Sequence, residues 1–114
     1  MFEKAVSDLF SALGAKTIVT SKSGDYGIDI IVEYEEKKYA VQCKHHSNPV
    51  GPAPLRELRG VVEGEFDKGI FVSLNGYTKQ AKSENYSAHR KLILLDKNSL
   101  IRMAETNNME LFLK

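Results

Sequence analysis

Two neighbouring stretches, Ile28 to Glu35 and Lys38 to His46, carry the β-branched and aromatic residues of strands and are separated by a very short polar connection. The second stretch also alternates between apolar and polar residues, as a strand does. The connection, Glu35-Glu36-Lys37-Lys38, leaves room only for a tight turn, although the sequence has no Asn-Gly pair there. The chain is therefore predicted to contain an antiparallel β-hairpin.

The remaining elements follow from hydrophobic periodicity and turn residues. The expected helices and strands are a helix with Phe2, Val6, Leu9 and Leu13 at helical spacing before Gly14, a strand at 15–21, the two hairpin strands, a helix at 55–66, a strand at 70–74, a polar helix within 77–90 with Thr78 as its N-cap, a strand at 91–96 and a helix at 98–106. The order α-β-β-β-α-β-α-β-α predicts an α/β fold with a central mixed sheet flanked by helices. We expect the strands at 70–74 and 91–96 to lie in the buried middle of that sheet.

Composition narrows the class of protein. The chain has 114 residues and a formal net charge of +1, which fits one domain over residues 1–114 and neither requires nor excludes a polyanionic partner. The only cysteine, Cys43, excludes an intramolecular disulfide and a multi-cysteine zinc cluster, and favours an intracellular, cytoplasmic location. The N-terminus MFEKAVSDLF lacks the apolar run of a signal peptide, and no window is long enough for a transmembrane helix. We expect no membrane partner.

Three polar side chains of the hairpin are expected on one face of the sheet. If Glu36-Lys37 is the loop, Asp29 lies opposite Lys44 and Ile31 lies opposite Gln42. Asp29, Gln42 and Lys44 then project from the same side, with the Cβ atoms of Asp29 and Lys44 about 5 Å apart. The other face is apolar and supports this register: Ile28, Ile30, Val32, Tyr34, Tyr39, Val41 and Cys43.

A carboxylate, an amide oxygen and an ammonium group in one place suit metal-assisted hydrolysis of a phosphodiester. Carboxylate and amide oxygens are hard ligands that Mg²⁺ prefers, and a lysine can orient water or offset charge on a phosphate. The alternative is a cross-strand ion pair between Asp29 and Lys44, worth a few tenths of a kcal/mol. Asp29 follows the turn GDYG, and a Pro/Gly loop, Ser47 to Pro54, leaves the third strand where a substrate could approach.

Several motifs in order resemble the Mrr-like branch of the PD-(D/E)xK nuclease superfamily. The turn-strand GDYGIDIIV is followed by YAVQCKHH, which resembles the family's Asp and Gln-x-Lys pattern at Asp29, Gln42 and Lys44. The resemblance extends to Phe2-Glu3 at the start of the first helix, Leu13-Gly14 at its end, Pro49-Val50-Gly51, and Arg56-Glu57-Leu58 in the next helix. It therefore covers nearly the whole chain and implies the restriction-endonuclease-like fold.

The resemblance implies a DNA endonuclease that uses Mg²⁺, with Mn²⁺ as an alternative. It implies that Asp29, Gln42, the Cys43 main-chain carbonyl and Glu3 bind the metal, and that Lys44 is the catalytic lysine. Glu3 lies beside the apolar stripe of the first helix, which allows this role. A solvated glutamate stabilised by the helix dipole is the alternative for Glu3.

Further residues are candidates for contact with DNA phosphates. Lys22 and Ser23 precede the site in the turn, and His46 falls on the side of Gln42 and Lys44. Arg56 and Arg59 share one face of a helix, where they could bind phosphate or pair with Glu57 and Glu63 at the surface. His45 is expected to pack at the strand end, and Cys43 to face the core.

The sequence departs from the wider superfamily in two places. Ile28 replaces the proline before the aspartate, and Gln42 replaces an acidic ligand, so the site has one less negative charge and is expected to bind metal more weakly. A structure-selective nuclease like the archaeal Holliday junction resolvases, acting on branched DNA, and a non-catalytic DNA-binding module of the same fold are the alternatives. We see no second domain for sequence recognition and expect a catalytic domain alone. Cutting both strands of a duplex with one site per chain favours a homodimer.

Overall fold

A computed structural model describes residues 2–20 and 27–113 of the chain. Their elements are α1 (Phe2–Ala12), β1 (Lys16–Val19), β2 (Ile30–Tyr34), β3 (Lys37–Lys44), α2 (Pro52–Val62), β4 (Lys68–Ser73), α3 (Lys79–Ser87), β5 (Ile93–Leu95), α4 (Lys97–Thr106) and the short 3₁₀ helix η1 (Glu110–Phe112). The predicted order of helices and strands is confirmed. Thr78 caps α3 as predicted, because its side chain accepts a hydrogen bond from the Ala81 N–H.

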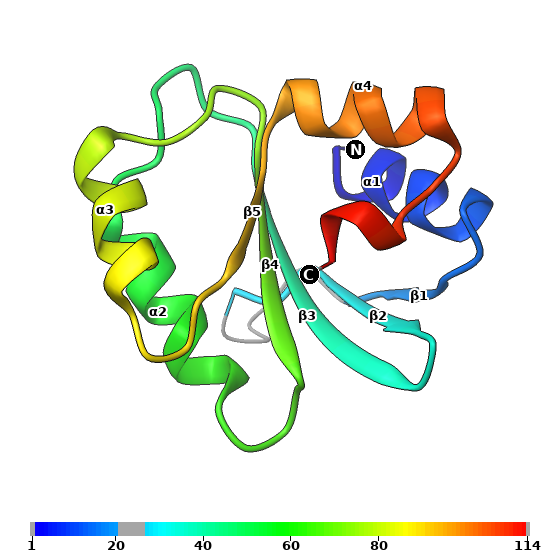
Figure 1. The fold of residues 1–114 in the computed structure, drawn as a ribbon, viewed down its shortest axis with the longest axis horizontal. Coiled ribbons are helices and arrows are strands. Elements are labelled where there is room, and N and C mark those ends of the chain that lie inside the picture. The colour runs from blue at the N-terminus through cyan, green and yellow to red at the C-terminus, as the bar shows by residue number, and fades with distance from the viewer. Residues whose placement is uncertain (1, 21–26, 114) are drawn as a thin grey trace.

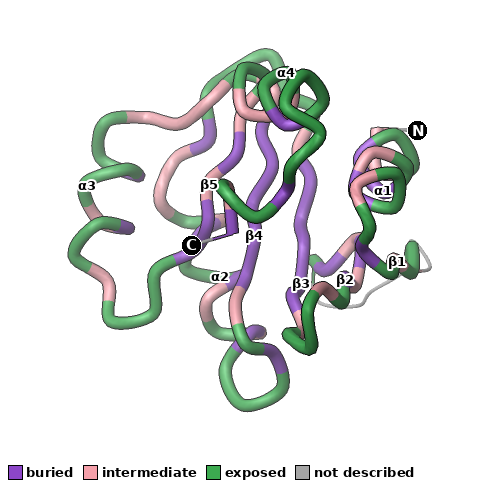
Figure 2. Tube along the Cα trace, turned by 45° about the vertical axis from the view of Figure 1, so that its right-hand side comes forward, coloured by how far each residue is buried: buried purple, intermediate pink, exposed green. Residues whose placement is uncertain are grey.

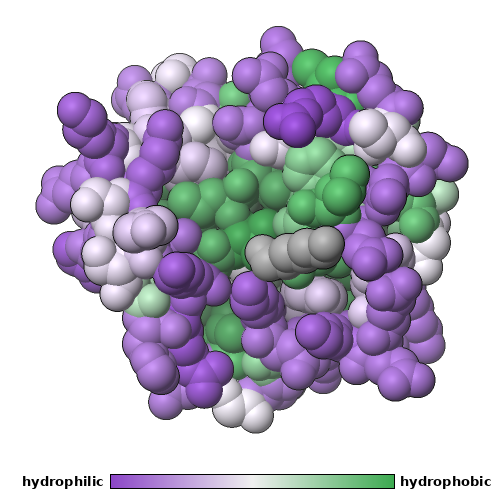
Figure 3. Space-filling model, viewed as in Figure 1, coloured by the Kyte–Doolittle hydropathy of each residue, from purple (hydrophilic) through white to green (hydrophobic). Residues whose placement is uncertain are grey.

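The strands of the described residues form one mixed sheet in the order β1-β2-β3-β4-β5. β1, β2 and β3 are antiparallel neighbours, whereas β4 and β5 add in parallel to β3. The expectation that both short apolar strands lie in the middle is wrong for β5, which is an edge strand. In Figure 3 hydrophobic residues gather over the region where β5 runs, with hydrophilic residues around them. Ile93 and Leu95 of β5 are buried although β5 is an edge strand, so its apolar sequence resembles that of a central strand.

Two helical layers cover the two faces of this sheet (Figure 1). α1, α4 and η1 lie on one side and α2 and α3 on the other. β3 and β4 are nearly continuously buried along their length (Figure 2). Burial on both faces places the middle of β3 between two hydrophobic cores. One core includes Val6, Phe10, Ile30, Val41, Cys43, Val72 and Met103, and the other includes Ile28, Ala40, Leu55, Leu58, Phe71 and Ala81.

The hairpin turn lies one residue earlier than predicted. Tyr34 pairs with Lys37, so the loop is Glu35-Glu36 instead of Glu36-Lys37. Both loop residues have positive φ, +50° and +67°, as a two-residue type I′ turn requires. Glutamates rarely adopt this conformation, which is why their identity gave no signal.

The earlier turn shifts the register of β2 against β3 by two residues. Ile31 lies opposite Ala40, not Gln42, and continuing the pairing by one residue places Asp29 across from Gln42, not Lys44. A shift of two keeps the side chains of the paired residues, 30–34 and 37–41, on their predicted faces. Ile28 lies outside this pairing and packs in the core beneath α2, because it precedes β2 and the alternation does not extend to it. Within the described residues no helix is long and apolar enough to cross a membrane.

Candidate active site

Asp29 is held at the start of β2 by hydrogen bonds from three directions. Its N–H donates to the Val41 carbonyl at 2.8 Å, and its carbonyl accepts from the Thr20 N–H at 2.9 Å. The Thr20 hydroxyl donates to the Ile28 carbonyl at 2.6 Å, which fixes the preceding peptide. The Asp29 carboxylate oxygen Oδ2 accepts a hydrogen bond from the Cys43 N–H at 2.7 Å. The carboxylate is therefore fixed against the main chain of β3.

The environment of Asp29 raises the pKa of its carboxyl group above the usual value. Burial is the largest cause, and the negative charge of Glu3 acts in the same direction. The Cys43 N–H and the positive charge of Lys44 lower the pKa, but by less. A half-buried carboxylate with a second carboxylate in electrostatic range is stabilised by any added positive charge.

The main-chain N–H and C=O of Cys43 point to the side of β3 on which Asp29 lies. N–H and C=O of one strand residue point to the same side of the strand, and these sides alternate along it. Because the Cys43 N–H reaches Asp29, its carbonyl also points toward the β2 side. The thiol faces the core, as predicted, and burial raises its pKa far above the usual value. Cys43 thus offers a main-chain oxygen, with the thiol kept protonated.

Gln42 is buried and packs against Gly27. A Cβ atom on Gly27 would lie 3.3 Å from the carboxamide Cδ, Oε1 and Nε2 of Gln42. Gly27 also has a φ of +85°, which side-chain-bearing residues rarely adopt. The turn therefore needs glycine at this position, and the close approach keeps the amide of Gln42 next to the start of β2.

Lys44 is the last residue of β3 and is half-buried. Its charge lowers the pKa of Asp29, so its ammonium group lies within electrostatic range of that carboxylate. In the parallel pairing with β4 it lies beside Ser73, which is buried and donates its hydroxyl to the Gly76 carbonyl at 2.9 Å. The strand ends of β3 and β4 thus meet at this edge of the sheet.

Glu3 approaches from α1, on the core side of Cys43. It is half-buried, and its charge raises the pKa values of both Asp29 and the Cys43 thiol. Next to it, the Phe2 ring lies 5.6 Å from the His45 ring, centroid to centroid. This contact joins the first turn of α1 to the residue after Lys44, which bears out the expectation that His45 packs at the strand end.

The donor set suits a hard divalent cation. Asp29 and Glu3 could supply carboxylate oxygens, and Gln42 and the Cys43 carbonyl could supply neutral ones, a set whose chemistry matches Mg²⁺ or Mn²⁺ and not a soft metal. The negative charge of Glu3 raises the pKa of Asp29, which indicates a negative potential at this carboxylate that a cation would relieve. Among the described residues no group of three or more His, Cys, Asp and Glu side chains could hold a metal, so a metal bound here would also require other oxygens, such as those of Gln42 and the Cys43 main chain.

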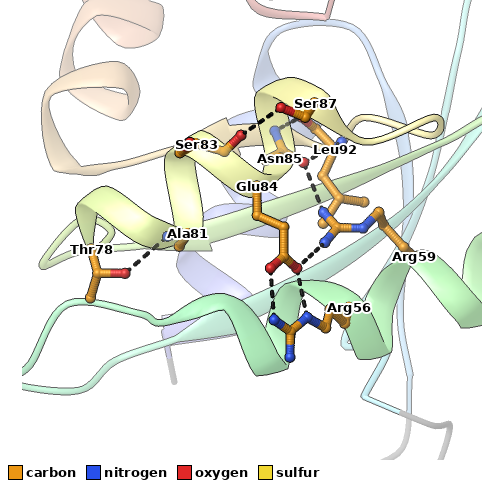
Figure 4. Close-up of polar contacts among 9 residues, drawn as sticks. All are labelled: Arg56, Arg59, Thr78, Ala81, Ser83, Glu84, Asn85, Ser87 and Leu92. Carbon is orange, nitrogen blue, oxygen red and sulfur yellow. Dashed lines mark hydrogen bonds and ion pairs between the residues drawn. The ribbon is translucent and has the colours of Figure 1, made fainter.

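The predicted DNA contacts fall in different places. His46 is exposed beyond β3, and its carbonyl accepts a hydrogen bond from the Asn75 side chain. Lys22 and Ser23 lie outside the described residues. Arg56 and Arg59 pair neither with Glu57 nor with Glu63: both bind Glu84 of α3, Arg56 at 2.6 Å and 2.7 Å and Arg59 at 3.2 Å (Figure 4). Both arginines thus join α2 to α3.

Four supporting residues were missed. Thr20 and Gly27 shape the entry to β2, Asn75 ties the loop after β4 to the loop after β3, and Glu84 neutralises the two arginines. The turn motif around Gly27 could have indicated its role, since glycine there implies special backbone geometry. The partners of Glu84 are 28 and 25 residues away, and no spacing rule connects them.

Comparisons with known proteins agree with this geometry. The family model Mrr_cat, described as restriction endonuclease, matches residues 1–104. A comparison with curated protein sequences found no match.

Solved structures share the fold at low identity. The DNA modification-dependent restriction endonuclease AspBHI superposes with a TM-score of 0.73 at 21% identity, over 94% of this chain and 32% of that one. AF1548, a protein of unknown function, superposes with a TM-score of 0.71 at 17% identity, over 91% of this chain and 65% of the AF1548 chain. MspJI restriction endonuclease, in complex with a 27-mer oligonucleotide, superposes with a TM-score of 0.62 at 20% identity, over 98% of this chain and 28% of MspJI. The chain spans less than two thirds of each of them.

The structural matches establish the restriction-endonuclease-like architecture of the sheet and its helices. The sequence match extends from the first residue through most of α4, and so includes Glu3, Asp29, Gln42 and Lys44. On this match the protein belongs to the Mrr_cat restriction endonuclease family.

Proposed function

We propose that this chain is a divalent-metal-dependent DNA endonuclease whose active site consists of Asp29, Gln42, Lys44, Glu3 and the Cys43 carbonyl. The observation that carries the proposal is the hydrogen bond from the Cys43 N–H to Asp29 Oδ2 at 2.7 Å. It brings the carboxylate from one strand to the main chain between Gln42 and Lys44 on the next. An ion pair on a strand surface would not need this main-chain anchor.

Each residue has a distinct role in the proposed reaction. Asp29, Glu3, Gln42 and the Cys43 carbonyl would hold the cation. Bound Mg²⁺ or Mn²⁺ would polarise the scissile phosphate and lower the pKa of a coordinated water. Lys44 orients the attacking water and offsets the negative charge that develops on the phosphate oxygens. Because Asp29 Oδ2 already accepts the Cys43 N–H, Oδ1 is the Asp29 oxygen that would be offered to a cation.

DNA as the substrate is supported by the family, and by the 27-mer oligonucleotide bound to MspJI. Lys22 and Ser23 precede Asp29 in the sequence and His46 follows Lys44, and these three residues are the proposed phosphate contacts. We leave Arg56 and Arg59 out of this set because Glu84 already binds both guanidinium groups.

Cleavage of supercoiled plasmid tests the proposal. The wild type should convert it to open-circular or linear DNA with Mg²⁺ or Mn²⁺ and not with EDTA. Asp29→Asn and Lys44→Ala should each reduce the rate by about 100-fold or more. Asp8→Asn and Lys79→Ala are matched controls, because they make the same changes at exposed positions of α1 and α3. Circular dichroism checks that every variant is folded.

Wild-type rates in both Asp29→Asn and Lys44→Ala would overturn the proposal, as would undiminished cleavage in EDTA. The same assay on a four-way junction and on linear duplex separates a structure-selective nuclease from one that cuts ordinary duplex.

We also propose that the active form is a homodimer. One site per chain cuts one strand at a time, and a two-fold axis places a second site on the opposite strand. Analytical ultracentrifugation with and without an uncleaved oligonucleotide duplex tests this. A monomer that makes double-strand breaks in a single binding event would contradict it.

A further inference from the structure

A pocket of about 300 Å³ lies at the end of the sheet opposite the proposed active site. Its lining residues come from α2, the start of β4 and the segment leading into β5: Arg59, Val62, Asp67, Lys68, Gly69, His89, Arg90, Lys91 and Leu92. In the β3–β4 pairing Lys68 lies beside Tyr39, whereas Ser73 lies beside Lys44. Five residues of strand separate these two positions, about 17 Å. The pocket and the proposed active site are therefore separate places.

The pocket concentrates positive charge. Four cationic side chains and one carboxylate line it, and because Glu84 already binds the Arg59 guanidinium, three further cations, Lys68, Arg90 and Lys91, stand against the single carboxylate of Asp67. One oxygen of this carboxylate, Asp67 Oδ2, accepts a hydrogen bond from the main-chain N–H of Lys38 at 2.7 Å. Among the described residues neither Lys68 nor Arg90 forms an ion pair. Such a site has a positive potential that an anion would neutralise.

One wall of the pocket is fixed by a polar network (Figure 4). Arg59 donates to Asn85 Oδ1 at 3.0 Å and to Glu84 at 3.2 Å. The buried Asn85 also accepts from the Leu92 N–H at 2.9 Å and donates to the Leu92 carbonyl at 3.0 Å. This network joins α2, α3 and the chain entering β5. Because it is already formed, a ligand would meet a wall that needs no reordering.

The floor of the pocket is apolar and closely packed. A Cβ atom on Gly69 would lie 2.7 Å from Leu92 Cδ2 and 2.8 Å from Val62 Cγ2, so the side chains of the floor pack directly on the Gly69 backbone. Tyr86 does not line the pocket, but its side chain is 78% exposed and its ring lies 4.9 Å from Nζ of the lining residue Lys91. An apolar floor, cationic rim and exposed aromatic ring suit a ligand that has both an anionic group and a flat apolar body.

We propose that this pocket binds an organic phosphate of mononucleotide size, either free or at the 5′ end of a nucleic-acid strand. Arg90 and Lys68 contact the phosphate, and the nucleoside lies over Val62 and Leu92. The volume is near the lower limit of small-molecule sites, which are roughly 300–1,000 Å³. The proposal does not depend on nuclease activity, because none of the lining residues belongs to the proposed active site.

NMR titration of the ¹⁵N-labelled chain tests the proposal, with EDTA present so that the proposed metal site takes no phosphate. Deoxyadenosine monophosphate should shift the amides of Lys68, Gly69 and Leu92, and should bind about tenfold or more tightly than deoxyadenosine. Arg90→Glu should weaken binding by about tenfold or more, whereas Lys79→Glu, the same charge change at an exposed residue outside the pocket, should not. Inorganic phosphate should bind more weakly than the nucleotide, because it lacks the apolar body.

A single-stranded oligonucleotide with and without a 5′-phosphate distinguishes the two sources. If the amides of Gly69 and Leu92 shift only with the 5′-phosphorylated oligonucleotide, the site binds the 5′ end of a nucleic-acid strand. If they shift with the mononucleotide but with neither oligonucleotide, the site binds the free nucleotide. No shifts with the mononucleotide at millimolar concentration would overturn the proposal. So would equal binding of nucleoside and nucleotide, full binding by Arg90→Glu, or shifts confined to Cys43 and Lys44.

Discussion

The Cys43 N–H donates a hydrogen bond to Asp29 Oδ2 at 2.7 Å, joining β3 to the residue just before β2. This bond replaces the ladder pairing, which ends at Ile30 and Val41. Where the two strands stop pairing, the main chain of Cys43 becomes available to a ligand. The carboxylate that occupies its N–H also fixes where its carbonyl points, so the site depends on strands that separate at the right residue.

Gly27→Ala should damage the site more than the fold. Its φ of +85° costs alanine about 1–2 kcal/mol, and the new Cβ would lie 3.3 Å from the Gln42 carboxamide. Thermal unfolding should show this loss of stability. DNA cleavage at saturating Mg²⁺ should fall further than the loss of folded protein explains, because Gln42 is displaced.

Gly60→Ala is the matched control for that variant. Gly60 lies within α2 with no atom within 4 Å of the added Cβ, so the change should stabilise the helix by about 0.5–1 kcal/mol and leave cleavage unchanged. Cleavage by Gly27→Ala at the wild-type rate would show that Gln42 does not need its present position.

The contact between Phe2 and His45 should position Glu3. An aromatic pair of this kind contributes about 0.5–1.5 kcal/mol, and here it joins the first turn of α1 to the end of β3. His45→Ala should reduce cleavage by about three- to tenfold and weaken Mn²⁺ binding measured by calorimetry. His45→Phe keeps a ring and should restore both. Equal loss in both variants would assign His45 a role through its imidazole nitrogens instead.

The faces of the strands could be predicted from the sequence, whereas the register could not. Alternation assigns Asp29, Gln42 and Lys44 to one side, and a shift of two residues preserves the faces of the paired residues, 30–34 and 37–41. The turn at Glu35-Glu36 needs two left-handed residues, and nothing in the identity of glutamate indicates them. The expected pairing of Asp29 with Lys44 was therefore wrong, and the shared face stays a prediction for Asp29, which precedes β2 as Ile28 does.

Contacts between elements that are distant in the chain also could not be predicted from the sequence. The helix spacing of Arg56 and Arg59 predicts one shared face, but not that this face meets α3 at Glu84. Likewise, burial of β5 follows from its apolar residues, but its place at the sheet edge depends on which strand it pairs with. Both are decided by packing of whole helices and strands, which no local pattern records.

The pairing of Glu84 with Arg56 should make stability depend on pH. The hydrogen bond from Arg56 is the main cause that lowers the pKa of Glu84 below its usual value. The unfolded chain then binds a proton more readily than the folded one, so stability is gained above the unfolded pKa and lost as pH falls through the folded pKa. Glu84→Gln should lower Tm at pH 7, and its deficit relative to wild type should shrink as pH falls below about 4.

Glu57→Gln is the control for this prediction. Glu57 is exposed on α2 and forms no ion pair among the described residues, so its removal should change Tm little at any pH. A Tm deficit of Glu84→Gln that is the same at pH 7 and in acid would mean that shape, and not charge, accounts for it.

Replacing Gln42 by glutamate should exchange stability for metal affinity. Gln42 is 9% exposed and is the neighbour of Cys43, whose N–H binds the Asp29 carboxylate, so a further carboxylate at residue 42 is desolvated and repelled. In EDTA the Gln42→Glu variant should unfold at a lower Tm, with a loss of about 1–3 kcal/mol. With Mn²⁺ the added charge becomes a ligand, and affinity should rise by about tenfold, which is about 1.4 kcal/mol.

Thermal unfolding across a series of Mn²⁺ concentrations measures both effects, because a ligand that binds only the folded chain raises Tm with its concentration. Gln80→Glu makes the same change at an exposed residue of α3 and should respond to Mn²⁺ as the wild type does. If Mn²⁺ stabilises Gln42→Glu no more than the wild type, the side chain at residue 42 does not contact the metal. The cation would then have to be held by Asp29, Glu3 and the Cys43 carbonyl without it, and Gln42 would serve only to pack against Gly27.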